Sequence, residues 1–155
     1  RRHSFPTRRS SDLCIEPTFG VDRLVLAVLS DAYREEGVGE DVRVYLKLAP
    51  SVAPIKACVS PLLKNKPELV ARAQEVYAEL KAHFGAIAYD DNGNIGKRYR
   101  RQDEIGTPFC IVVDFDTLGE NTEQKGTVTV RNRDTGTQER VAIDMLKSFL
   151  AEHLS

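Results

Sequence analysis

Strand-like and helix-like segments alternate along most of this 155-residue chain, and this alternation limits the folds that are open to it. One strand is expected at 109–113, where FCIVV is a continuous apolar run typical of a central strand covered on both faces. Further strands are expected at 55–59, 86–89, 127–131 and 138–143. Helices are expected at 67–84, between Pro67 and Gly85, at 94–106 with Asn94 as its cap, and from 144 onward.

These elements predict an α/β fold with a mixed sheet. Parallel neighbours need helical crossovers, whereas the last two strands flank the turn NRDTG and close as a hairpin. Upstream, a helix is expected at 20–36, a polar linker at 37–41 and an alternating strand at 42–48. The first half of that helix, residues 24–29, is apolar all the way round, which is typical of a helix inside a larger body.

The first thirteen residues, RRHSFPTRRSSDL, differ from the rest because they carry four Arg against one Asp. A basic arm can be a nucleic-acid tail, but HSFPTRRSSDL resembles the translation of a common short-read sequencing adapter. We interpret 1–13 as a non-native tail, and an adapter joined to coding sequence suggests a gene truncated at this end. The whole chain has 22 basic and 23 acidic residues, so 18 and 22 remain without the tail. The resulting net charge of −4 excludes a globally basic nucleic-acid binder and leaves room only for a local patch.

The composition excludes several other classes. No apolar run approaches the roughly 20 residues that cross a bilayer, and no secretory signal is present, so a cytoplasmic protein without a membrane partner is expected. Cys14, Cys58 and Cys110 are far apart in apolar stretches, which indicates reduced thiols rather than a disulfide or metal site. The turn at Asp90 and Asp91 lacks the ligand spacing of a calcium loop, so no metal site is expected.

Two segments could carry chemistry. In IEPTFGVDR, the carboxylate of Glu16 precedes Gly20, which would let a planar ligand approach the backbone, and Arg23, which could meet phosphate oxygens. A capped helix with a surface arginine explains the same spacing. The run KRYRR at 97–101 is either a solvated face neutralised by nearby acids or a patch for phosphates and bases. Composition does not separate these two interpretations.

Four segments, in order, resemble one family. CIEPTFGVDRLVLAVLSDAY resembles motif 3 of class II aminoacyl-tRNA synthetases, in the form found in homodimeric glycyl-tRNA synthetases. The resemblance continues through LAPSVAPIKACVSPL, NIGKRYRRQDEIGTPFCIVVDFDT and GTVTVRNRDTGTQERV, and covers residues 14–155. It implies the end of a catalytic domain and linker at 14–41 and an anticodon-binding domain at 42–155, with a mixed five-stranded sheet and three helices. The rivals are a non-catalytic accessory nucleic-acid-binding module and a prolyl-, threonyl- or histidyl-tRNA synthetase.

The resemblance implies ATP-dependent ligation of glycine to tRNA(Gly) by a homodimer that uses ATP with magnesium. Arg23 would grip ATP, with Gly20 beside it, while Glu16 would hold the glycine ammonium group with help from the hydroxyl of Thr18, where Ser is usual. Such chemistry leans on cations rather than on a protein nucleophile, so no catalytic residue is expected here. Because motifs 1 and 2 are absent, the chain alone is expected to be inactive.

Contacts with tRNA are expected on the helix at 94–106. Arg98, Arg100 and Arg101 are candidates for backbone phosphates. Asp103 or Glu104 could accept from the amino groups of the cytosines in a glycine anticodon, because an ionised carboxylate only accepts hydrogen bonds. These acids could instead pair with the neighbouring arginines. If neither acid reads bases, Asp116 after the central strand is the next candidate.

Overall fold

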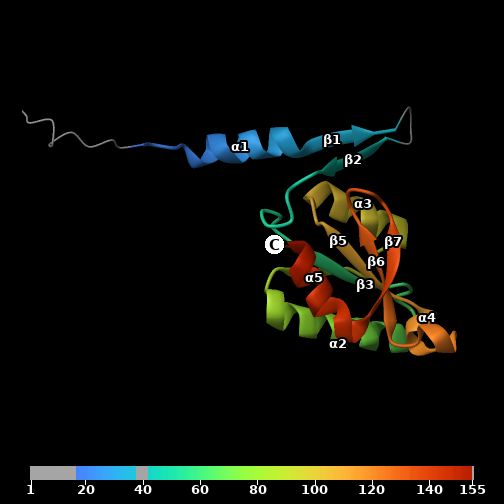
Figure 1. The fold of residues 1–155 in the computed structure, drawn as a ribbon. Helices are drawn as coiled ribbons and strands as arrows, with labels where there is room; N and C mark the ends of the chain where they lie inside the picture. Colours follow the sequence, from blue (N-terminus) through green and yellow to red (C-terminus); the bar gives the residue numbers. More distant parts are fainter. Residues whose placement is uncertain (1–16, 38–41, 155) are drawn as a thin grey trace, which may run out of the picture.

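The computed structural model describes residues 17–37 and 42–154 (Figure 1). The expectations for the tail at 1–13, for Cys14 and Glu16, and for linker residues 38–41 lie outside the described residues. The described helices and strands are α1 (Val21–Ala32), β1 (Tyr33–Glu36), β2 (Arg43–Leu46), β3 (Ala57–Pro61), α2 (Pro67–Phe84), β4 (Ile87–Tyr89), α3 (Ile95–Ile105), β5 (Phe109–Val113), α4 (Phe115–Leu118), β6 (Thr127–Asn132), β7 (Gln138–Ala142) and α5 (Leu146–Leu154).

The main sheet has five strands in the order β4-β3-β5-β6-β7. Strand β3 is parallel to both of its neighbours, β4 and β5, whereas β5, β6 and β7 are antiparallel in succession. The expected α/β fold with a mixed five-stranded sheet is therefore confirmed. The run FCIVV is β5, fully buried in the middle of the sheet, as its continuous apolar pattern predicts.

Helices cover both faces of this sheet. The face that carries Val59 and Ile111 packs against Leu69 of α2 and Leu150 of α5 in the main hydrophobic core. The opposite face carries Cys58, Cys110 and Arg131, and α3 lies over it, with Arg131 stacked on Tyr99. Figure 1 shows α3 on one side of the sheet and α2 with α5 on the other.

The ends of α2 and α3 follow their sequence signals. Pro67 starts α2 and Gly85 ends it, while the side chain of Asn94 caps α3 by accepting from Lys97 N at 2.9 Å. Gly106 ends α3 in the left-handed conformation, with φ 86°. A Cβ at Gly106 would also lie 2.8 Å from Leu48 Cδ1 and 3.1 Å from the backbone oxygen of Leu46, so both the left-handed φ and the close approach favour glycine.

The helix expected at 20–36 ends early. It stops at Ala32, and Tyr33–Glu36 continue as strand β1, which pairs antiparallel with β2 in a separate two-stranded sheet. The cause is tertiary, because backbone pairing with β2 and the bond from Tyr45 Oη to Glu36 Oε1 at 2.5 Å stabilise the extended form. The boundary expected between 41 and 42 therefore falls inside one hairpin. A four-residue helix after β5, α4, is a further element that the sequence pattern did not indicate.

Helix α1 has little cover. Ala32 is its buried residue and packs with Leu48 and Ala53 in a second, small core. The apolar side chains before it are exposed, and Figure 1 shows α1 extending away from the α/β body. These side chains form an exposed apolar surface along α1.

Candidate nucleic-acid interface

A crevice opens where two parallel strands send the chain to opposite faces of the sheet. After β3 the chain turns to α2 on one face, and after β4, the next strand in the sheet, it turns to α3 on the other. The loops therefore diverge at the carboxyl ends of β3 and β4, which is where open α/β sheets bind their ligands. The crevice has a volume of about 470 Å³ and is lined by Leu62, Leu63, Lys64, Asn65, Gly93, Asn94, Ile95 and Arg98.

The crevice has the chemistry of a nucleotide site. Leu62, Leu63 and Ile95 give it apolar surface on which a planar base can lie. The polar side chains of Lys64 and Asn65 stand exposed on the β3 side. On the other side, the first turn of α3 offers backbone N–H groups at the positive end of a helix dipole. An unstacked base with a phosphate beside it matches this combination of groups.

Arg98 lies inside the protein rather than on its surface. Its side chain is buried, with 2% of the residue exposed. It donates to Pro61 O at the end of β3, and to Asp91 O at 3.0 Å and Gly93 O at 2.8 Å in the loop after β4. The guanidinium is therefore engaged by backbone carbonyls, and this burial corrects the expectation that Arg98 contacts the tRNA backbone.

Arg101 is also engaged by the loop after β4. Its guanidinium binds the carboxylate of Asp90 in a forked ion pair, with Nη2 to Oδ2 at 2.6 Å and Nε to Oδ2 at 3.0 Å, and donates to Asn92 O at 2.6 Å. Of the three arginines expected to meet phosphates, Arg100 is the exposed one without a bond to the loop among the described contacts.

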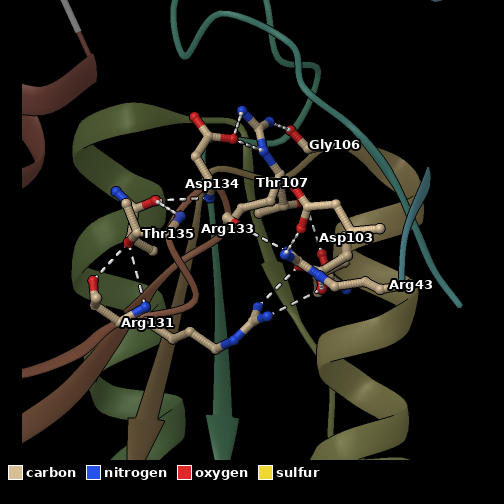
Figure 2. A network of polar contacts seen from close by, with 12 residues as sticks. Arg43, Asp103, Gly106, Thr107, Arg131, Arg133, Asp134 and Thr135 are labelled. Carbon is tan, nitrogen blue, oxygen red and sulfur yellow. Dashed lines mark hydrogen bonds and ion pairs between the residues drawn. The ribbon is translucent and has the colours of Figure 1, made fainter. Parts of the chain in front are cut away.

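Asp103 holds three elements together (Figure 2). Its carboxylate, on α3, accepts from Arg43 Nε of β2 at 2.9 Å and from both terminal nitrogens of Arg131 on β6, at 2.9 and 3.1 Å. Burial lowers the pKa of Arg131, but its hydrogen bonds and ion pair with Asp103 outweigh that effect and raise it. Because this carboxylate is buried and already accepts hydrogen bonds from two arginines, it is not accessible to a cytosine amino group. The alternative that these acids pair with the neighbouring arginines of the same helix is wrong for Asp103, because its arginine partners come from β2 and β6.

Arg133 is a structural residue that the sequence analysis did not identify. It is buried after β6 and donates from Nη1 to Gly106 O and from Nη2 to Leu48 O, both at 2.7 Å, while Nε meets Asp134 (Figure 2). It thereby joins the end of α3 to the segment after β2. A surface hairpin sequence such as NRDTG gives no signal for this burial, because its acceptors are backbone carbonyls from distant segments.

The exposed face of α3 keeps two of the expected residues. Arg100 and Glu104 are exposed on it, and Lys97 is exposed in its first turn. Tyr99 is half-buried under the guanidinium of Arg131, at 4.7 Å from its ring centroid, and burial raises its pKa to about 12. The patch interpretation of KRYRR therefore reduces to Lys97 and Arg100, with Tyr99 packed on the sheet side.

At the end of β5, acidic residues bind Arg140. Asp114 caps α4 through Thr117 and accepts from Arg140 Nη1 at 3.0 Å, while Asp116 Oδ2 accepts from Arg140 Nη2 at 2.6 Å. Burial opposes ionisation of Asp114, but the bonds from Arg140 and Thr117 outweigh it, so its pKa lies below the ordinary value. Asp116, the reserve candidate for reading bases, is half-exposed in an ion pair outside the crevice lining.

The residues expected to bind ATP and glycine lie around the start of α1. Gly20 precedes the helix in extended conformation, Arg23 lies exposed in its first turn, and Thr18 is exposed before both. An exposed guanidinium at the positive end of a helix suits phosphate oxygens. None of these residues lines the crevice, and Glu16 lies outside the described part of the chain.

Two further expectations concern metals and membranes. Within residues 17–37 and 42–154, no group of three or more His, Cys, Asp or Glu side chains is placed to hold a metal ion. No helix in the same ranges is long and apolar enough to cross a bilayer.

Comparison with known proteins links this geometry to a family. Residues 56–153, which hold the main sheet and its helices, match the family described as anticodon binding domain. Three similar curated proteins are the glycine–tRNA ligases of Thermus thermophilus, 51% identical over 146 residues, of Alkaliphilus metalliredigens, 54% over 142, and of Chlorobaculum tepidum, 52% over 140. These matches cover 90%, 91% and 90% of this chain and 29%, 29% and 28% of the respective relatives. The chain thus spans less than a third of the length of the relatives it matches.

Proposed function

This chain belongs to the anticodon-binding domain family, and on that premise we propose that it is the tRNA-recognising C-terminal part of a glycine–tRNA ligase. The observation that carries the proposal is the crevice at the carboxyl ends of β3 and β4, which combines apolar walls with polar groups and the start of α3. Its size and chemistry suit an unstacked anticodon base.

The charges around the crevice support a local RNA surface on a chain that is acidic overall. Lys64 stands on the β3 side, and Lys97 and Arg100 stand on α3, all three exposed. Neutralising a few phosphates needs only such a local group of cations. Glu104, exposed one helical turn beyond Arg100, remains our candidate for accepting from a cytosine amino group.

For the whole protein we propose ATP-dependent ligation of glycine to tRNA(Gly), by a homodimer in the cytoplasm. ATP would supply the adenylyl group that activates the glycine carboxylate, with pyrophosphate as the leaving group, and magnesium would neutralise charge on the phosphates. Arg23 would bind ATP phosphate oxygens near Gly20, and Thr18 and Glu16 would contact glycine. The exposed position of Arg23 at the start of α1 fits a phosphate ligand. We expect no glycine-dependent exchange of pyrophosphate into ATP from the present chain alone, because its described residues assemble no further ATP or glycine contacts.

The experiment is binding of anticodon stem-loop RNA, followed by fluorescence anisotropy. One RNA carries a glycine anticodon, and a matched RNA has its anticodon cytosines replaced by uracil. We expect tighter binding of the first, with amide chemical-shift changes centred on Gly93 and Asn94. Equal binding of both RNAs would contradict the proposal, as would shift changes confined to residues outside the crevice.

A pair of lysine variants tests the location. Lys64→Met at the crevice should weaken both RNAs and lower the slope of log Kd against log salt by about one, since one phosphate contact is lost. Lys81→Met is the matched control, because Lys81 is exposed in the last turn of α2, away from the strand ends that form the crevice. The control should bind like the unchanged chain, and an equal effect of both variants would mean diffuse attraction rather than a site.

A further inference from the structure

The loop after β4, residues 90–94, is held by two arginines of α3 that bind four of its five residues. Arg101 binds the carboxylate of Asp90 and Asn92 O, and Arg98 binds Asp91 O and Gly93 O. The two arginines stand three positions apart, so their side chains leave the same side of the helix. Every residue from 90 to 93 thus gives at least one acceptor to α3.

Arg98 also reaches the other wall of the crevice. Its Nη1 donates to Pro61 O, the last residue of β3, while its Nη2 donates to the loop after β4. One buried guanidinium therefore ties together the two segments whose divergence forms the crevice. Arg98 also lines the crevice, with Leu62 on one side and Gly93 on the other.

This geometry requires arginine in particular. A guanidinium is a planar fork with donors pointing in fixed, diverging directions, so it can reach carbonyls on two segments at once. A lysine ammonium keeps the charge but is a single point at the end of a flexible chain. Because only 2% of Arg98 is exposed, its charge does not lie where a phosphate could contact it.

We propose that Arg98, supported by Arg101, is the positioning residue that sets base selectivity in the crevice, without touching RNA itself. With its carbonyls drawn toward α3, the loop after β4 is held in one conformation against the end of β3. A base site held this rigidly discriminates between cytosine and uracil, because a base whose pairing edge does not match the fixed polar groups of the crevice forms fewer hydrogen bonds with them. The inference rests on the proposed function, since selectivity presupposes that RNA binds the crevice.

The test compares Arg98→Lys with Arg100→Met in the present chain, using the glycine stem-loop and its uracil-substituted partner at several salt concentrations. Arg98→Lys should reduce the preference for the cytosine loop by about tenfold, the order of one lost base contact, while leaving the salt slope unchanged. Arg100→Met should weaken both RNAs alike and lower the slope by about one. Urea unfolding of each variant gives its folded fraction, by which the affinities are corrected. A loss of folded protein lowers the apparent affinities for both RNAs equally and leaves the ratio of the two affinities unchanged.

A second variant keeps the inference testable if Arg98→Lys does not fold. Asp90→Asn weakens the ion pair with Arg101 and removes one negative charge. It should strengthen binding to both RNAs through charge while reducing the preference between them. An unchanged preference for the cytosine loop in either folded variant would overturn the inference. So would an Arg98→Lys variant that changes only the slope of log Kd against log salt. If the unchanged chain shows no preference for the cytosine loop, the proposed function itself is contradicted, whatever the variants do.

Discussion

Asp103 on α3 and Arg131 on β6 form a two-point ion pair inside the fold, with Oδ1 to Nη1 at 2.9 Å and Oδ2 to Nη2 at 3.1 Å. The same carboxylate accepts from Arg43, so one aspartate connects the central sheet, its covering helix and the β1–β2 hairpin. A residue one position from the exposed Glu104 therefore has a different task, because successive residues on a helix face about 100° apart.

We expect Asp103→Asn to lower the free energy of unfolding by about 3 kcal/mol, because it leaves two arginine charges without their buried partner. Urea unfolding measures the change. Glu104→Gln, the exposed neighbour, should stay within about 0.5 kcal/mol of the unchanged chain. Similar stabilities for the two variants would show that the pair contributes little.

The exposed face of α3 supports a separate prediction about base reading. Glu104→Gln should narrow the affinity gap between the cytosine and uracil loops, because the amide loses acceptor capacity toward the cytosine amino group. Anisotropy with both RNAs checks this. Asp103→Asn, corrected for its folded fraction, serves as the buried control and should leave the gap unchanged. If the affinity gap survives Glu104→Gln, we assign base reading to residues of the crevice, such as Asn65, rather than to the exposed face of α3.

The exposed apolar side chains of α1 predict self-association. Leu24, Val25 and Leu26 are each about half-exposed or more, and α1 forms an apolar groove with Leu46, Leu48, Val52, Pro54 and Ile105. A chain that begins near Asp41 should be more monodisperse in light scattering than the full chain. Leu26→Glu in the full chain should act in the same direction without deleting the hairpin. Equal dispersity in all three samples would contradict the argument.

The two buried cysteines should be chemically silent in the folded state. Burial raises the pKa of Cys58 to about 12 and raises the pKa of Cys110 as well, so almost no thiolate is present near neutral pH. In a Cys14→Ser chain, Ellman's reagent at pH 8 should label neither thiol until urea unfolds the protein. Fast labelling without denaturant would show that this face of the sheet opens readily.

The lowered pKa of Asp114 predicts how the free energy of unfolding changes at acidic pH. Its pKa is lowered in the folded state, so its stabilising contribution is present above the unfolded pKa near 4 and is lost as the pH falls through the lower folded value. The difference in unfolding free energy between the unchanged chain and Asp114→Asn should be constant above about pH 5 and shrink below pH 4. Arg140→Met removes the donor at 3.0 Å and should reduce the same pH dependence. A difference that does not vary with pH would refute the assignment.

Local signals in the sequence predicted most elements of the α/β body. Pro67, Asn94 and Gly106 mark helix ends through backbone chemistry that needs no tertiary partner, and the apolar run at 109–113 is the buried central strand. The same local signals extended the predicted helix at 20–36 beyond its true C-terminal end. Tyr33–Glu36 instead form a strand, because they pair with residues after the linker. The sequence did not predict the crevice, because it depends on β4 lying beside β3 and on α2 and α3 covering opposite faces of the sheet, which only the tertiary structure decided.

What the sequence determined by itself was the alternation of strands and helices, the family that this order and its motifs resemble, and the confinement of any RNA surface to a local patch. Only the tertiary structure decided which members of KRYRRQDE meet solvent. Arg98, Arg101 and Asp103 turn to carbonyls and charges contributed by other segments, while Arg100 and Glu104 stay exposed. The physical reason is that the side chains of one short helix point in all directions, and a charge becomes buried only where distant backbone and side-chain partners replace the water that it loses.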